Sequence, residues 1–136
     1  MGTWSHEPFG NDTACDWAYG LDEHDGLELI ESTIDRALSE CDEYLEAPSG
    51  EEAIAAIEVV AKILGKGTQE DSYTESIDEW VKKVNVKPSD ELVSKINKLI
   101  PMLTSEKSEL TELWEEADDF NDWKDSIDQL SKAINT

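Results

Sequence analysis

The sequence predicts an all-α protein, a compact bundle of six or seven helices that forms one domain over residues 1–136. Apolar residues recur at intervals of three and four along most of the chain, which lines one face of a helix. No stretch alternates apolar and polar residues as a strand does, and no unit repeats at a fixed period. The length is enough to bury one core without disulfides or metals.

The first helix is predicted to begin at Asn11 or Asp12 and to run to about Leu21. Either side chain at its start can accept hydrogen bonds from the free backbone N–H groups of the first turn. Phe9 precedes this cap, and we expect it to fold back onto the first turn near Trp17, as a hydrophobic staple does.

Two further helices are predicted in the first half of the chain. The second follows Gly26, carries an apolar stripe over residues 27–45 and ends before Pro48, and its opposite face is almost wholly acidic. The third begins at residues 49–52 and ends at Gly65, where a left-handed cap residue is expected. Alanines along the third helix permit close approach by its neighbours, so we expect it to be the central helix.

A short helix is predicted over residues 77–84, and Pro88 follows it as a break, because the residue before a proline disfavours helix. Ser89 opens the next helix, with two acidic residues in its first turn. Pro101 is expected to kink that helix or to end it near Lys98.

Two helices are predicted in the remaining chain. Ser105 or Ser108 caps one that carries residues 110–117, and the last helix spans residues 123–134. The acidic turn between them, residues 118–122, could coordinate calcium, but it lacks the glycine and the terminal glutamate of a calcium loop. We therefore interpret it as a connection between helices with a capping role.

Charge restricts the classes of partner. The chain has 33 acidic and 11 basic residues, a formal net charge of −22, so nucleic acid and anionic membranes are poor partners. Residues 1–50 hold 13 acidic residues and a single basic one, Arg36, so negative charge is concentrated in the first third of the chain. No apolar stretch approaches the roughly 18 residues that a membrane span needs.

Cysteine usage and motifs give little support to catalysis. Cys15 and Cys41 have neither a metal-binding nor a redox spacing, and no secretory leader is expected, so the sequence predicts a reduced, cytoplasmic protein. Cys15 lies between acidic residues, which disfavour a thiolate nucleophile, and Cys41 falls on an apolar stripe. Without a recognisable catalytic triad or a phosphate-binding loop, we expect a non-enzymatic protein without a cofactor.

The second helix and the turn before it carry the candidate binding surface. Its acidic residues are Asp22, Glu23, Asp25, Glu28, Glu31, Asp35, Asp42, Glu43 and Glu46. A field of this density can capture a basic partner, speed the encounter and fix the orientation of the complex. The alternative is a solvated face without a partner.

A second hypothesis is a metal site near the N-terminus. Asp12 and Asp16 are spaced i, i+4 and can project from one helix face, with His6, Cys15 and His24 nearby in the sequence. No further ligand has a recognisable spacing, and both aspartates are equally explained by capping and by the helix dipole. The alternative function is therefore a metal-binding protein or metal-dependent enzyme that uses Asp12, Asp16 and His24.

Four of the five tryptophans are predicted to be core residues, since they fall at helical spacing beside aliphatic residues: Trp17, Trp80, Trp114 and Trp123. Trp4 precedes any helix. We expect it to pack in the same patch as Phe9, and it is the tryptophan most open to a partner.

Residues along nearly the whole chain resemble the bacterial domain-of-unknown-function 4259 family. The opening residues that carry the resemblance are Met1-Gly2-Thr3-Trp4, Phe9, Asn11-Asp12, Ala14 and Asp16-Trp17. Later blocks that are similar are residues 53–61 with Gly65, residues 88–93, residues 108–116 and Trp123. The chain departs from the family at Ser5 and Glu7, where glycines are typical. The resemblance implies a small, soluble, helical bacterial protein and carries over no catalytic residue.

These observations together favour a non-enzymatic, strongly acidic binding protein that neutralises a basic protein partner. The leading hypothesis is a toxin immunity protein, or another inhibitor that acts on a nucleic-acid-processing protein, because small size, high negative charge and the lack of catalytic motifs suit such a role.

Overall fold

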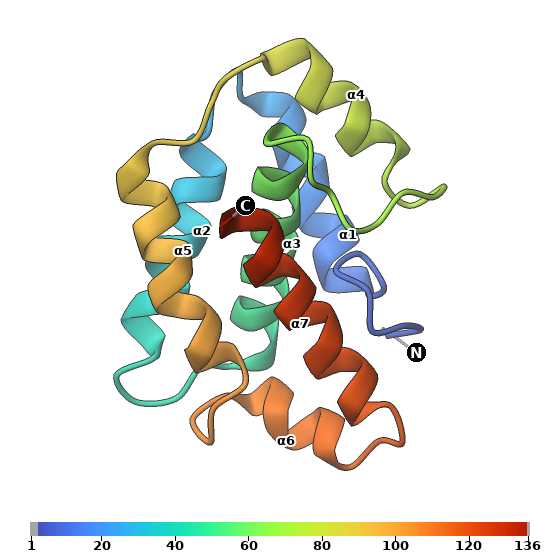
Figure 1. Cartoon of the computed structure of the whole chain (residues 1–136), viewed down its shortest axis with the longest axis vertical. Coiled ribbons are helices and arrows are strands. Elements are labelled where there is room, and N and C mark those ends of the chain that lie inside the picture. Colours follow the sequence, from blue (N-terminus) through green and yellow to red (C-terminus); the bar gives the residue numbers. More distant parts are fainter. Residues whose placement is uncertain (1–2, 136) are drawn as a thin grey trace.

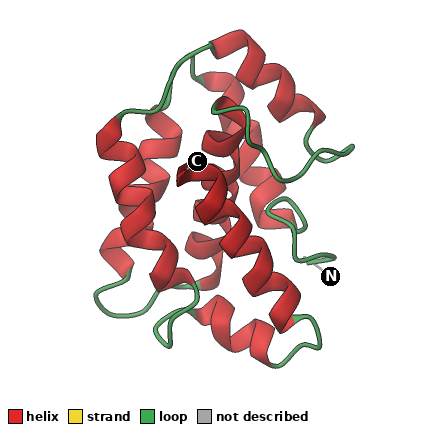
Figure 2. Ribbon diagram, viewed as in Figure 1, coloured by secondary structure: helices red, strands yellow, loops and turns green. Residues whose placement is uncertain are grey.

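The computed structural model describes residues 3–135, and within them the chain folds into seven α-helices and one 3₁₀ turn (Figure 1). The elements are α1 (Asp12–Tyr19), η1 (Gly20–Glu23), α2 (Glu28–Glu40), α3 (Ala47–Ile63), α4 (Glu75–Val84), α5 (Asp90–Leu103), α6 (Glu109–Glu115) and α7 (Phe120–Asn135). In this part of the chain, β-structure is limited to two isolated bridges, and loops join the helices (Figure 2). The predicted all-α fold is confirmed.

Helix α3 is the central helix, as its alanines predict. It packs against α1, α2, α4, α6 and α7, and every residue from Ala53 to Ala61 is buried. In Figure 1 it lies in the middle of the molecule, behind α7. Gly50 permits the close approach of α6, because a Cβ atom there would lie 2.8 Å from the Cδ1 atom of Leu110.

The segment before α1 is held by local and long-range hydrogen bonds. The Oδ1 atom of Asn11 accepts from the Ala14 N–H at 2.8 Å, which confirms the predicted cap. Phe9 is wholly buried and joins the core together with Trp17, and its N–H donates to the Oε1 atom of Gln69 at 2.8 Å. Trp4 remains half-exposed instead of joining this core.

The end of α2 differs from the prediction. The helix ends at Glu40, short of the predicted end before Pro48, because the chain then turns to bring Leu45 beside the segment before α6. The Leu45 N–H donates to the carbonyl oxygen of Lys107 at 2.7 Å, and the Leu45 carbonyl accepts from Glu109 N–H at 2.8 Å. Helix α3 then begins at Ala47, with the proline in its first turn, where the missing N–H costs no helical hydrogen bond.

Helix α5 also differs from the prediction. Its start is as expected, since the Ser89 Oγ atom accepts from the Leu92 N–H at 3.1 Å. However, the helix does not end near Lys98, because it continues through Pro101 to Leu103. The proline lies in the last turn, where it leaves only the exposed carbonyl of residue 97 without a helical donor, while buried side chains hold that turn in place.

The other helix boundaries agree closely with the sequence. Gly65 has a φ angle of 77° and follows α3 in the left-handed conformation. Ser108 occupies the cap position of α6, although its Oγ atom is buried and has no hydrogen-bond partner in the described part of the chain. Helix α7 begins within the predicted acidic turn and buries the expected residues: Trp123, Ile127, Leu130 and Ile134.

Candidate functional site

The nine acidic residues of the predicted binding surface are all exposed. We call them the acidic surface: Asp22 and Glu23 on η1, Asp25 in the following loop, Glu28, Glu31 and Asp35 on α2, and Asp42, Glu43 and Glu46 between α2 and α3. Their side chains are therefore open to the solvent.

Within the described residues, few basic side chains lie within ion-pair distance of the acidic surface. The Nζ atom of Lys95 lies 2.9 Å from Asp35, and the Nδ1 atom of His24 lies 3.2 Å from Glu28. Arg36, although it projects from α2, lies 3.4 Å from a glutamate outside the surface. Within residues 3–135, the other seven carboxylates have no lysine, arginine or histidine within ion-pair distance.

Part of the acidic surface is concave. A hollow of about 530 Å³ lies at the turn between α2 and α3, and the charged residues that line it are all acidic. Tyr44 lies among them and is 38% exposed. An aromatic ring beside several carboxylates suits an ammonium or guanidinium group, which can bind the ring face and an anion together. The hollow is therefore the part of the surface best suited to a lysine or arginine.

Helix α6 fixes the ring of Tyr44. Its hydroxyl donates to the Oε2 atom of Glu112 at 2.7 Å, and this hydrogen bond, with desolvation and nearby carboxylates, raises the pKa of Tyr44 to about 12. Glu109, one turn earlier on α6, accepts from the Ala47 N–H at 2.7 Å. One face of α6 thus supports the hollow through its carboxylates.

We expect the phenol of Tyr44 to ionise near pH 12. Because this folded-state pKa lies above the ordinary value of 10.0, the stabilisation from the hydrogen bond is complete below pH 10 and is lost as the pH rises through about 12. The measurement is a phenolate absorbance titration with Tyr19 and Tyr73 replaced by phenylalanine. Adding Glu112→Gln should lower the midpoint, whereas Glu116→Gln should not; an unchanged midpoint with Glu112→Gln would contradict the assigned contact.

The residues of the metal hypothesis are not brought together. Asp12 and Asp16 are exposed on α1, while His24 is paired with Glu28. Among the described residues, no group of three or more histidine, cysteine, aspartate or glutamate side chains is placed to hold a metal ion.

The two free cysteines have environments that disfavour the thiolate. Burial raises the pKa of Cys15, and Asp12, Asp16 and Asp71 raise it further. Burial likewise raises the pKa of Cys41, with a smaller contribution from the acidic residues beside it. Neither thiol has the electropositive surroundings that activate a nucleophile.

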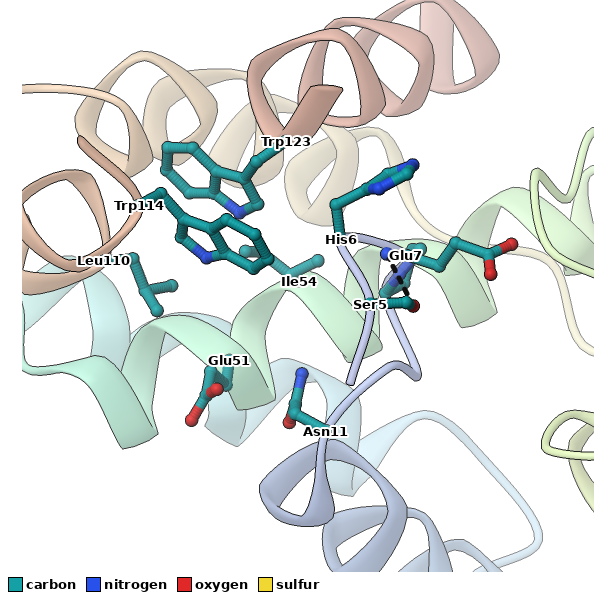
Figure 3. A pocket seen from close by; sticks show the side chains of 10 residues that line it. Ser5, His6, Glu7, Asn11, Glu51, Ile54, Leu110, Trp114 and Trp123 are labelled. Carbon is teal, nitrogen blue, oxygen red and sulfur yellow. Dashed lines mark hydrogen bonds between the residues drawn. The ribbon is translucent and has the colours of Figure 1, made fainter. Parts of the chain in front are cut away.

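A second hollow, which the sequence did not predict, lies between the N-terminal segment and helices α3, α6 and α7. Figure 3 shows its inner part: Trp114 and Trp123 lie side by side, with Glu51 and Asn11 across from them. The two indole rings are stacked with centroids 6.0 Å apart. His6 belongs to the N-terminal wall of this hollow. Its backbone carbonyl oxygen accepts a hydrogen bond from the Oγ atom of Ser126 on α7 at 3.1 Å.

The inner part opens into a wider groove. We call the whole feature the tryptophan groove: its outer part has a volume of about 490 Å³ and is bordered by Trp4 and by Leu113 and Trp114 of α6. Leu113, one of the apolar residues predicted along this helix, is 50% exposed in the structure.

Fold and surface together define a small, strongly acidic, all-helical protein. The family model described as Domain of unknown function (DUF4259) matches residues 2–126, so the chain belongs to this family and the resemblance seen in the sequence is confirmed. Comparisons with curated proteins and with solved structures gave no match. Among the described residues, no helix combines the length and the apolar character that crossing a membrane requires.

Proposed function

We propose that this protein is a non-enzymatic binding protein whose acidic surface captures and neutralises a basic protein partner. The observation that carries the proposal is the set of seven exposed carboxylates without a cation within ion-pair distance in residues 3–135. A partner's lysines and arginines can pair with them without breaking an existing ion pair. Binding would also relieve the repulsion among these carboxylates.

The shape of the surface supports a specific contact in addition to long-range attraction. The net charge of −22 draws a basic protein toward the acidic surface and raises the rate of encounter. The open hollow beside Tyr44 then offers one position for a cationic side chain. Charge thus supports fast association, and the hollow supports a defined orientation.

The class of partner follows from the same chemistry. Proteins that process nucleic acids carry cationic surfaces for phosphate groups, and a dense carboxylate surface competes for those surfaces. We therefore propose a role as a toxin immunity protein or a related inhibitor. The two free cysteines suit the reducing cytoplasm as its place of action.

Neutralising the hollow is expected to weaken partner binding by about tenfold, since three exposed ion pairs contribute roughly 1–2 kcal/mol together. The variant combines Asp42→Asn, Glu43→Gln and Glu46→Gln. Its control, Glu115→Gln with Glu116→Gln and Asp118→Asn, removes the same charge from exposed residues elsewhere. Capture from host extracts at low and high salt identifies the partner. Calorimetry with the purified partner then measures the loss of affinity.

Two outcomes would overturn this proposal. One is that no basic protein is retained at low salt. The other is that the hollow variant and its control bind the partner equally well, which would assign any attraction to net charge alone. The immunity role has its own test: expressing this chain should restore growth to cells that produce a toxic basic protein encoded beside its gene, and unrelieved toxicity would reject that role.

A further inference from the structure

The tryptophan groove exposes large apolar side chains at one place on the surface. Trp4 is 44% exposed and Leu113 is 50% exposed, and both border the same hollow of about 490 Å³. Trp114 and Ala117 continue this apolar lining along and beyond α6. The volume lies in the range of protein sites that enclose a ligand or a side chain of a partner.

The ionisable residues that line the outer groove are both acidic. Glu51, from the first half of α3, is only partly exposed, and Asp119 lies just before α7. Burial raises the pKa of Glu51, while a hydrogen bond with Thr13 lowers it. In the described chain, no lysine, arginine or histidine lines this outer part. A cation that reached Glu51 would therefore pair with a carboxylate already partly removed from water.

Asn11 adds an unused donor to the inner pocket. The residue is 8% exposed, and its Oδ1 atom must face the Ala14 N–H to accept from it, so Nδ2 is the atom at the other end of the amide. That Nδ2 atom has no hydrogen-bond partner within residues 3–135, and Figure 3 shows the amide directed into the pocket. The inner pocket, about 20 Å³, has room for one water or one carbonyl oxygen.

Charge decides between the possible occupants of the groove. A second copy would bring together two chains that each carry a net charge of −22, and the described residues of the outer groove include no lysine, arginine or histidine to pair with the acidic residues of that copy. A purely apolar occupant would leave Glu51 in a drier place without a cation. A segment with an apolar side chain and a neighbouring lysine or arginine satisfies both features.

We propose that the tryptophan groove binds a short segment of a protein partner that carries a large apolar residue beside a lysine or arginine. The apolar side chain packs between Trp4 and Leu113, and the cation pairs with Glu51. The Nδ2 atom of Asn11 donates to a carbonyl oxygen of the segment, directly or through one water. This site does not depend on the acidic surface, because the groove lies along the apolar residues of α6, whereas Glu109 and Glu112 support the other hollow.

The test selects short random peptides displayed on phage against the full-length protein. We expect the enriched peptides to contain an apolar residue next to a lysine or arginine. Leu113→Ser should weaken their binding by about 10–100-fold, and Glu51→Gln by about tenfold. Leu113 is half-exposed, so its variant should fold, and circular dichroism verifies this. The matched control is Val86→Ser, at an exposed aliphatic residue that does not line the groove.

Each alternative result overturns the proposal. Peptides that bind Leu113→Ser as well as the natural protein would place the site elsewhere, and enriched peptides without basic residues would reject the role of Glu51. Failure to enrich any peptide would reject the site itself. A dimer in sedimentation experiments that Leu113→Ser dissociates would make a second copy the occupant. The variant of Asp42, Glu43 and Glu46 should still bind the peptides, so this site and the proposed function can fail separately.

Discussion

Replacing Glu58 with alanine is expected to lower the free energy of unfolding by about 3–5 kcal/mol. Glu58 lies on the central helix and is wholly buried. Its carboxylate accepts from the Thr68 N–H at 2.9 Å, from the Thr68 hydroxyl at 2.7 Å and from the Gln69 N–H at 2.8 Å. Alanine would leave these donors without an acceptor and leave a cavity beside them.

The same carboxylate belongs to a network that joins three parts of the fold. Lys62, nearly buried one turn later on α3, lies 3.9 Å from Glu58 and 2.8 Å from Asp78 on α4. Its ammonium group also donates to the carbonyl oxygen of Gln69, whose side chain in turn holds the N–H of Phe9. Removing the Glu58 carboxylate should therefore also weaken the contacts that hold α4 and the N-terminal segment.

Chemical denaturation measures the loss of stability in Glu58→Ala. The control is Glu79→Ala on the exposed side of α4, which should change stability by less than about 0.5 kcal/mol.

The pH dependence of stability gives a second measurement. Burial raises the pKa of Glu58 above 4.5, so its contribution to stability is largest below pH 4.5 and declines as the pH rises through the folded-state pKa. The stability of the natural protein relative to Glu58→Gln should decline over that interval. A loss below about 1 kcal/mol in Glu58→Ala would contradict the network's importance.

Phe9→Ala is expected to destabilise the protein by about 3–5 kcal/mol, the usual cost of removing a wholly buried phenylalanine side chain. Phe9 anchors the segment that forms one wall of the tryptophan groove, and its N–H is hydrogen-bonded to Gln69 across 60 residues. Urea denaturation measures the loss of stability. Tyr19→Ala is the matched control, because Tyr19 is the most exposed aromatic residue of the adjoining helix and should contribute little.

Phe9→Ala should also weaken peptide binding in the tryptophan groove, because a loosened N-terminal segment no longer positions Trp4 opposite Leu113. A stability loss without any change in peptide binding would show that the wall does not depend on the anchor. A loss of less than about 1 kcal/mol would contradict the assigned packing of Phe9 itself.

The helix boundaries that the sequence predicted well are those set by local chemistry. Asn11 and Ser89 accept hydrogen bonds from N–H groups three residues later, and Gly65 adopts a conformation that glycine allows. The boundaries that it missed depend on distant residues. Helix α2 ends at Glu40 because Leu45 pairs with the chain near residue 108, and no pattern within the helix contains that information.

The candidate site divides in the same way. Six of the nine acidic residues were predicted to lie off the apolar stripe of the second helix and three in the turn before it, and the structure exposes all nine. The hollow did not follow, because the Tyr44 hydroxyl and Glu112 meet across 68 residues of sequence. Glu58 gave no signal either: a single glutamate in an apolar helix looks like a solvent-facing residue until the loop that hydrogen-bonds to it is in place.

The hydrogen bond that joins the N-terminal wall to α7 has a consequence for the order in which binding features form during synthesis. Ser126 on α7 donates to the carbonyl oxygen of His6, 120 residues earlier. Trp123, which also lies on α7, is stacked on Trp114 of α6. Chains emerge from the ribosome with the N-terminal end first. The last residue of the acidic surface, Glu46, therefore emerges well before the groove can be assembled. A partner that needs only the carboxylates can meet a nascent chain, whereas a partner that also needs the groove can recognise only a finished one.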